Sequence, residues 1–307
     1  MANITAKDVT ALKEQTGVGI MDCKKALIEA DGDVEAAIVI LREKGLATQA
    51  KKAGRIAAEG IVTSVVCGNV GAVVEVNIET DFAANNDEFK AFVNAVAMTV
   101  INTNPSDIDE LNATTIDGGD TTVAEALQNL FIKIRENMVI RRFKRLEGIL
   151  VPYVHGGGSI GVMVKLLTDL DASNTDVFEV GKNCALQIAA MNPAYLDRAS
   201  VPAEVLENEK KITLAQMAED PKMASKPEQV LAKIAEGKIG KYYTENCLLE
   251  QEYVKAEDKE SVAKYLANAG KKLGGAIEVA EFVRFERGEG IEKKADNFAD
   301  EVASMIK

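Results

Sequence analysis

Two stretches of the chain share one order of apolar and polar positions. In each, an apolar strand, a glycine-containing turn, a second apolar strand and a polar loop precede an amphipathic helix. Shifting the chain by 88 residues superimposes the two stretches, and nine of the 24 positions from Glu59 to Phe82 are then identical. Tight turns between short apolar strands are typical of antiparallel hairpins. The pattern therefore predicts an α+β fold whose core is duplicated, with each copy made of hairpins and helices.

The elements of the two copies are expected at matching places. The first copy should contain strands at 61–66 and 72–78 and a helix at about 87–101. The second copy should contain strands at 149–154 and 160–167 and a helix at about 177–190. A helical span at 123–134 lies between the copies, and a further strand is expected at 279–285.

The first 45 residues predict three short helices. Thr5 and Asp8 have the spacing of a capping box, so the first helix should begin there and end near Gly17. The second should run from about 21 to 30, and the third should begin after Asp33 and stop at Gly45. Helices of this length form a minimal bundle, which we expect to act as a docking module. Residues 46–58 are rich in alanine and basic, which predicts a helical linker.

A segment of different composition follows the second copy's helix. Residues 203–245 are highly charged and carry only a narrow apolar stripe in each arm, which predicts a solvated helical hairpin that protrudes from the core. The expected organisation is 1–45 for the docking module, 46–58 for the linker, 59–146 for the first copy, 147–201 with 246–287 for the second copy, 203–245 for the hairpin, and 288–307 for a C-terminal module that ends in a helix.

Composition argues against several classes of function. The formal net charge is −12, which disfavours nucleic-acid binding because phosphate backbones attract clustered Lys and Arg. With one histidine and no CxxC pair among four cysteines, no metal site is expected. No GxxxxGK[ST] motif occurs, and the glycines at 156–161 precede a predicted strand rather than a helix, so no nucleotide cofactor is expected. Without a signal peptide or a membrane-length apolar run, the sequence predicts a soluble, cytoplasmic protein with no membrane partner.

The end of the first copy's second strand is the strongest candidate site. Thr80, Asp81 and Phe82 leave this strand together, and loops at strand ends often present functional side chains. Asp81 would offer a charge and Phe82 an apolar wedge. The alternative is that Phe82 fills the core and Asp81 caps a turn. The second copy has Leu170 in place of Phe82, which favours the functional interpretation.

Three further places are candidates. Gly17 and Gly19 permit a tight loop that would expose Ile20 or Met21 as an apolar knob followed by Lys24, although Ile20 and Met21 are equally suited to the bundle core. His155, in the second copy's hairpin turn, is expected to be either an exposed contact residue or an ordinary turn residue. A basic cluster after residue 134 is expected to pair with neighbouring carboxylates; it consists of Arg135, Arg141, Arg142, Lys144 and Arg145.

Several of these motifs together resemble the bacterial elongation factor Ts family. The resemblance covers essentially the whole chain and is carried by four stretches: Leu12–Leu27, Glu75–Phe82, Tyr153–Gly156 and Arg284–Glu292. It implies a guanine-nucleotide exchange factor, without covalent chemistry of its own, for the translational GTPase elongation factor Tu. It also implies a UBA-like N-terminal bundle, a protruding coiled coil at the hairpin and a C-terminal helix that docks on the GTPase.

The resemblance also implies roles for single residues. Asp81 and Phe82, after Thr80, would intrude beside the magnesium and nucleotide of the partner. Ile20, Met21 and Lys24 would contact its GTPase domain, and His155 would belong to a second contact. Two other classes remain open at this point: an enzyme that uses Asp81 with His155 in a cleft between the copies, and a scaffold. Self-association through the helical hairpin is open as well.

Overall fold

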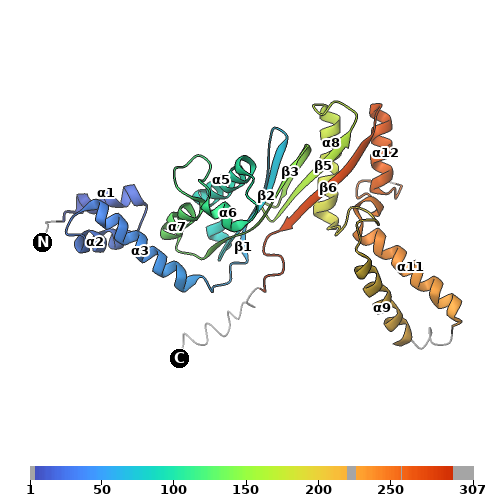
Figure 1. Ribbon diagram of the computed structural model, residues 1–307, viewed down its shortest axis with the longest axis horizontal. Helices are drawn as coiled ribbons and strands as arrows, with labels where there is room; N and C mark the ends of the chain where they lie inside the picture. Colours follow the sequence, from blue (N-terminus) through green and yellow to red (C-terminus); the bar gives the residue numbers. More distant parts are fainter. Residues whose placement is uncertain (1–3, 220–225, 257, 293–307) are drawn as a thin grey trace.

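Two three-stranded antiparallel sheets form the centre of the molecule. The computed structural model describes residues 4–219, 226–256 and 258–292. The first sheet has the order β1-β2-β3 and the second β4-β5-β6, and the two lie against each other (Figure 1). The strands are β1 Glu59–Cys67, β2 Val70–Ile78, β3 Met138–Glu147, β4 Ile149–His155, β5 Ile160–Thr168 and β6 Ile277–Glu286. A shared apolar cluster joins the sheets; it contains Val62, Val73, Leu146, Leu150, Met163 and Val283.

Each sheet has a long helix on its outer face. Helix α5 (Asp87–Thr103) covers the first sheet and α8 (Thr175–Met191) the second. Both helices begin at an asparagine cap and end at an asparagine in the left-handed region, with φ 50° at Asn104 and 45° at Asn192. Asparagine is among the few residues that adopt this conformation at low cost, so the two sequences end the two helices in the same way.

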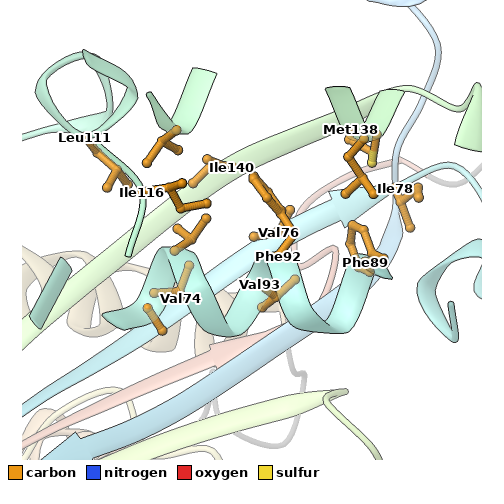
Figure 2. Packing of buried hydrophobic residues seen from close by; sticks show 14 of the residues in the cluster. Val74, Val76, Ile78, Phe89, Phe92, Val93, Leu111, Ile116, Met138 and Ile140 are labelled. Carbon is orange, nitrogen blue, oxygen red and sulfur yellow. The ribbon is translucent and has the colours of Figure 1, made fainter. Parts of the chain in front are cut away.

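The core of the first copy is closed by three further elements (Figure 2). Helix α5 supplies Phe89, Phe92 and Val93, and β2 supplies Val74, Val76 and Ile78. Helices α6 (Ile108–Ala113) and α7 (Val123–Ile134) and strand β3 complete the cluster. In the second copy α12 (Val262–Leu273) and β6 take the places of α7 and β3. The predicted α+β fold is confirmed, and its two copies have matching sheets and matching helices.

Strand β3 was not predicted from the sequence. Its ten residues include Arg141, Arg142, Lys144 and Arg145, which were interpreted only as a basic cluster. The strand lies at an edge of its sheet, where charged side chains can remain in contact with solvent. Its apolar positions do not alternate regularly, because Met138, Val139 and Ile140 are consecutive, so the period of two that reveals a strand is absent.

The predicted end of the third N-terminal helix was wrong. Helices α1 (Ala6–Thr16) and α2 (Ile20–Glu29) lie close to their expected places, but α3 runs from Val34 to Lys52. Gly45 does not stop this helix. A Cβ atom at Gly45 would lie 2.6 Å from Cγ1 of Ile132 on α7, so glycine is required there for close approach of two helices. The helix therefore crosses the boundary expected at residue 45.

Two helices extend away from the second copy. Helix α9 (Ala203–Glu219) and helix α11 (Glu228–Asn246) pack side by side and point away from both sheets (Figure 1). A short helix η1 (Leu248–Glu250) returns the chain to the core. The predicted helix at 295–307 lies outside the described residues. No helix in the described ranges is long and apolar enough to cross a membrane.

Candidate partner-binding surface

Phe82 lies on the surface. Strand β2 ends at Ile78, and a single-turn helix, α4 (Asp81–Ala84), begins three residues later. The Thr80 hydroxyl caps this turn by accepting a hydrogen bond from the Ala83 amide at 3.2 Å. Ala83 and Ala84 are buried, whereas the Phe82 side chain is 87% exposed. The interpretation of Phe82 as a core residue is therefore wrong.

Asp81 is equally free of internal partners. Its carboxylate makes no hydrogen bond or ion pair with any residue that the structure describes. It lies with Phe82 at the side of a shallow groove, whose far wall includes Gly17 of the N-terminal bundle and Lys133 of α7. Lys133 is itself paired with Glu88 at 2.6 Å. The groove thus presents one unpaired carboxylate beside one exposed aromatic ring.

The N-terminal bundle exposes two neighbouring apolar side chains. Ile20 and Met21 begin α2 and are 49% and 62% exposed, and Lys24 follows on the next turn, also exposed. Val18, which precedes them, is buried instead, and the buried Cys23 thiol donates to its carbonyl at 3.5 Å. The suggestion that Ile20 and Met21 belong to the bundle core is therefore wrong.

Contacts with α7 fix the bundle beside the Phe82 groove. Arg135, the residue after α7, forms an ion pair with Asp22 of α2 at 2.5 Å. A Cβ atom at Gly17 would lie 2.7 Å from Cε of Lys133, and Ile132 of α7 joins the bundle core. The exposed start of α2 and the exposed α4 turn therefore belong to one continuous assembly of α2, α7 and α4.

Two residues that hold the α4 turn were missed from the sequence. The carboxylate of Glu136 accepts from the Thr80 amide at 3.0 Å and from the Thr80 hydroxyl at 2.8 Å. The Asn137 amide donates to Glu79 at 2.6 Å, and its side chain donates to the Arg55 carbonyl at 2.8 Å. Both residues lie more than 50 positions after Thr80, so no local pattern points to them. Comparison of the two copies offers a signal, because the second copy has Gly275 and Ala276 after the equivalent helix.

His155 lies in a different part of the molecule. It ends β4 in the second copy, it is exposed, and its Nδ1 lies 2.9 Å from the Tyr153 hydroxyl. His155 does not line the groove beside Asp81. A cleft that combines Asp81 with His155, as an enzyme would need, is not formed by these residues. Within the described ranges, no group of three or more His, Cys, Asp or Glu side chains has the spacing for a metal ion.

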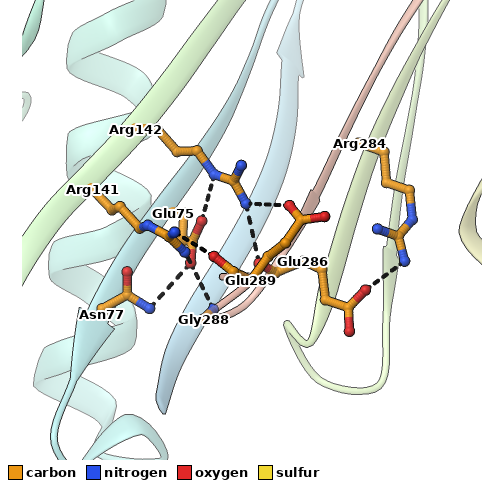
Figure 3. A network of polar contacts seen from close by, with 8 residues as sticks. All are labelled: Glu75, Asn77, Arg141, Arg142, Arg284, Glu286, Gly288 and Glu289. Atoms are coloured by element: carbon orange, nitrogen blue, oxygen red, sulfur yellow. Dashed lines mark hydrogen bonds and ion pairs between the residues drawn. The ribbon is translucent and has the colours of Figure 1, made fainter. Parts of the chain in front are cut away.

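The four arginines of the basic cluster pair with carboxylates, as predicted, whereas Lys144 forms no ion pair with the described residues. Glu75 of β2 is fully buried and receives Arg141 at 3.1 Å and Arg142 at 2.6 Å (Figure 3). The same carboxylate accepts from the Gly288 amide at 2.8 Å. Arg142 also pairs with Glu289 at 3.0 Å and lies 4.3 Å from the centre of the Phe285 ring. This network ties the end of β6 and the residues after it to the sheet of the first copy.

Comparison with known proteins agrees with this architecture. Residues 79–289 match the family model for elongation factor TS. The chain is 51% identical over 307 residues to elongation factor Ts of Clostridium perfringens (strain 13 / Type A), covering 98% of this chain and 99% of the relative. The chain belongs to the elongation factor Ts family. It is also 47% identical over 307 residues to the Syntrophotalea carbinolica protein and 46% identical over 308 residues to that of Clostridium botulinum (strain Alaska E43 / Type E3), each with 99% of both chains covered.

Membership of the elongation factor Ts family has a direct functional meaning. It implies a nucleotide exchange factor in translation elongation, with elongation factor Tu as its partner, rather than a catalyst of covalent chemistry. A role in binding a partner protein is consistent with the exposed apolar and charged side chains on α2 and α4.

Proposed function

We propose that the exposed turn at Asp81 and Phe82 promotes GDP release by entering elongation factor Tu beside its magnesium and nucleotide. The observation that carries the proposal is the 87% exposure of Phe82 on a turn whose neighbouring alanines are buried. A large aromatic side chain left in water has no stabilising role in the free protein. In an interface it supplies a large apolar area with few rotatable bonds.

Asp81 would act by charge. Its carboxylate has no internal partner in the described structure, so it is available to compete with phosphate oxygens for the magnesium of the partner. Placing a negative charge beside the bound nucleotide weakens nucleotide binding through Coulomb repulsion, which is strong where water is excluded. Thr80, which caps the turn, would hold both side chains in position.

We propose that the start of α2 is the second part of the same interface. Ile20 and Met21 would dock on the GTPase domain, and Lys24 would pair with an acidic residue of the partner. The bundle core is small, and such exposed apolar residues next to a charged rim are typical of interface centres. The attachment of the bundle to α7, through Ile132 and the ion pair of Asp22 with Arg135, supports joint action with the α4 turn.

Other expectations from the family resemblance are proposals of the same kind. They are a UBA-like character of the N-terminal bundle, a contact of His155 with a second domain of the partner, a coiled-coil role for α9 and α11 that includes self-association, a docking role for the C-terminal module 288–307, and a cytoplasmic location. The domain organisation given above is proposed together with them, with the docking module extended along α3 to Lys52.

Exchange requires a specific thermodynamic relationship. The factor must bind nucleotide-free elongation factor Tu more tightly than the GDP-bound form, and GDP must then weaken binding of the factor by the same ratio. The test is to mix the purified protein with labelled GDP alone and with elongation factor Tu that carries labelled GDP. We expect no binding of GDP by the protein alone and accelerated release from the partner. Binding of GDP by the protein alone, or an unchanged release rate, would contradict the proposal.

A further inference from the structure

The turn after the second strand of each copy begins with the same two residues but points its third residue in opposite directions. In the second copy this turn is Thr168-Asp169-Leu170. The Asp169 carboxylate accepts from the Ala276 amide at 2.6 Å, and the Thr168 hydroxyl donates to the Ala276 carbonyl at 2.6 Å. Leu170 then packs against the core of its copy. Leu170 is therefore directed inward, and Asp169 is hydrogen-bonded to Ala276 although it remains exposed.

In the first copy other residues make the corresponding hydrogen bonds. The Asn137 amide donates to Glu79, and Glu136 takes both the amide and the hydroxyl of Thr80. Asp81 is left without a partner among the described residues, and Phe82 is exposed. The turn is therefore held by Glu136 rather than by its own aspartate.

The difference originates in the connector that follows the equivalent helices α7 and α12. Each connector has three residues, 135–137 in the first copy and 274–276 in the second, and each begins with a left-handed residue, Arg135 (φ 63°) or Gly274 (φ 83°). The second residue is Glu136 in one copy and Gly275 in the other. The connectors thus differ in side-chain volume at the position that faces the turn.

A side chain at Gly275 would collide with the side chains of the inward turn. A Cβ atom there would lie 2.4 Å from Oδ1 of Asp169 and 2.6 Å from Cδ2 of Leu170. Contacts this short are not tolerated between packed atoms, so the side chains of Asp169 and Leu170 would have to shift from their inward positions. In the first copy, Glu136 occupies the matching connector position, and Asp81 and Phe82 do lie outside.

We infer that Glu136 is a positioning residue that turns Asp81 and Phe82 outward, by excluding the inward arrangement and by fixing Thr80 in its place. The connection to nucleotide exchange rests on the proposed function, but the orientation of the turn does not. Glu136 itself needs no contact with the partner. Its half-buried carboxylate acts through Thr80.

The chain contains no tryptophan, which permits a direct test of orientation in the free protein. Phe82→Trp places the only tryptophan of the chain in the turn, and excitation beyond the tyrosine absorption band selects it over the six tyrosines. With Glu136 intact we expect long-wavelength emission and efficient quenching by acrylamide. Glu136→Gly should shift the emission to shorter wavelength and reduce quenching, because the ring can then pack inward. Glu136→Gln, which keeps the volume and one acceptor, should retain the exposed signal.

The second copy provides the reciprocal test. In a Leu170→Trp variant we expect short-wavelength emission and weak quenching, and Gly275→Glu should move both towards the exposed values. Gly275 does not have a left-handed φ, so the substitution introduces no backbone strain of that kind. Because this pair of variants leaves the first copy intact, it tests the inference even if Glu136→Gly does not fold. Unchanged emission and quenching in both copies would overturn the inference.

The exchange assay separates this inference from the proposed function. On an otherwise natural chain, Glu136→Gly should lower the maximal rate of GDP release roughly tenfold, with a smaller change in the factor concentration at half-maximal rate. A fluorescence shift without any loss of exchange would sustain the positioning role and contradict the proposed role of Asp81 and Phe82. A loss of exchange without a fluorescence shift would contradict the positioning role.

Discussion

Phe82 and Leu170 occupy equivalent positions 88 residues apart, yet Phe82 is 87% exposed and Leu170 packs against an apolar core. The two copies therefore provide an internal control for any substitution at Phe82. They share the strand, the Thr-Asp pair and the following helix, and they differ in what the next side chain touches. If the exposed side chain at this turn promotes nucleotide exchange, only substitutions in the first copy should slow exchange.

We expect Phe82→Ala to change the free energy of unfolding by less than about 0.5 kcal/mol, since the side chain is already in water. A core phenylalanine would instead lose about 3–5 kcal/mol. The loss should appear in stopped-flow measurements as slower GDP release at saturating factor. Combining Asp81→Ala with Phe82→Ala should give less than the sum of the two effects, because both residues act on one site.

Leu170→Ala is the matched control. It should lower stability by about 1–2 kcal/mol, less than a fully buried leucine, and leave exchange per folded molecule unchanged. If Phe82→Ala unfolds the protein while exchange per folded molecule persists, the turn is structural and the exchange mechanism lies elsewhere.

The strands and helices with regular apolar spacing could be predicted from the sequence, and they define the fold. The exceptions are caused by contacts between residues that are far apart in sequence. Strand β3 carries many charges because Glu75 and its neighbours pair with them across the sheet. Gly45 resembles a helix stop, but it serves the approach of Ile132, which is far away in sequence.

The orientation of Phe82 could not be predicted for the same reason. Spacing along the chain favours a core residue at this position, and the outward orientation depends on Glu136, 54 positions later. Ile20 and Met21 present the same difficulty, because the packing of α1 and α3 on α2, together with Ile132 of α7, determines which face of α2 is covered. Secondary structure follows local sequence, whereas exposure at a site follows from tertiary contacts.

We expect Lys24→Glu to weaken association with elongation factor Tu while changing the melting temperature by only a few degrees. Lys24 is exposed and forms no ion pair with the described residues, and exposed charge changes usually alter stability by less than about 0.5 kcal/mol. Titration of exchange rate against factor concentration measures the effect. Lys7→Glu, on α1 of the same bundle, makes the same change in net charge. Equal weakening by both variants would assign the effect to long-range charge rather than to a contact of Lys24.

The four cysteines should differ sharply in reactivity. Cys67 is exposed at the end of β1, whereas Cys23, Cys184 and Cys247 are buried. Burial raises the pKa of the Cys184 thiol to about 12 and that of Cys247 to about 11. Since the thiolate is the reacting species, neither should react near neutral pH in the folded protein. A thiol-specific chromogenic reagent at pH 7.5 should therefore detect about one thiol before unfolding and four afterwards. Reaction of a thiol in the folded Cys67→Ser variant would show that another thiol is accessible.

Removal of residues 203–245, with a short linker in their place, should leave the core folded. Helices α9 and α11 pack mainly on each other and extend away from both sheets. The second core continues from α8 directly to η1 and α12. Unfolding by denaturant should remain cooperative. The slope of the unfolding free energy against denaturant concentration should fall in proportion to the surface removed. A non-cooperative melt would show that the two helices belong to the core of the second copy.

The last prediction concerns the buried carboxylate of Glu75. It is fully buried and accepts from Arg141, Arg142, Asn77 and the Gly288 amide, so it connects the first sheet to the residues that follow β6. Glu75→Ala would leave these donors without an acceptor. Removing one partner of a buried ion pair costs about 3–5 kcal/mol, and the partial exposure of both arginines reduces the expected loss to about 2–4 kcal/mol.

The consequence should be local as well as global. We expect faster hydrogen exchange at residues 286–289 in the Glu75→Ala variant, at denaturant concentrations where the rest of the protein is still folded. Glu147→Ala is the control, since Glu147 pairs with Arg145 on the same sheet but is 59% exposed, and exposed pairs contribute only about 0–1 kcal/mol. If both variants lose the same small amount of stability, the Glu75 network does not hold the end of β6. The chain after β6 would then depend on Arg287 and its contacts with Glu59 and Gly60 instead.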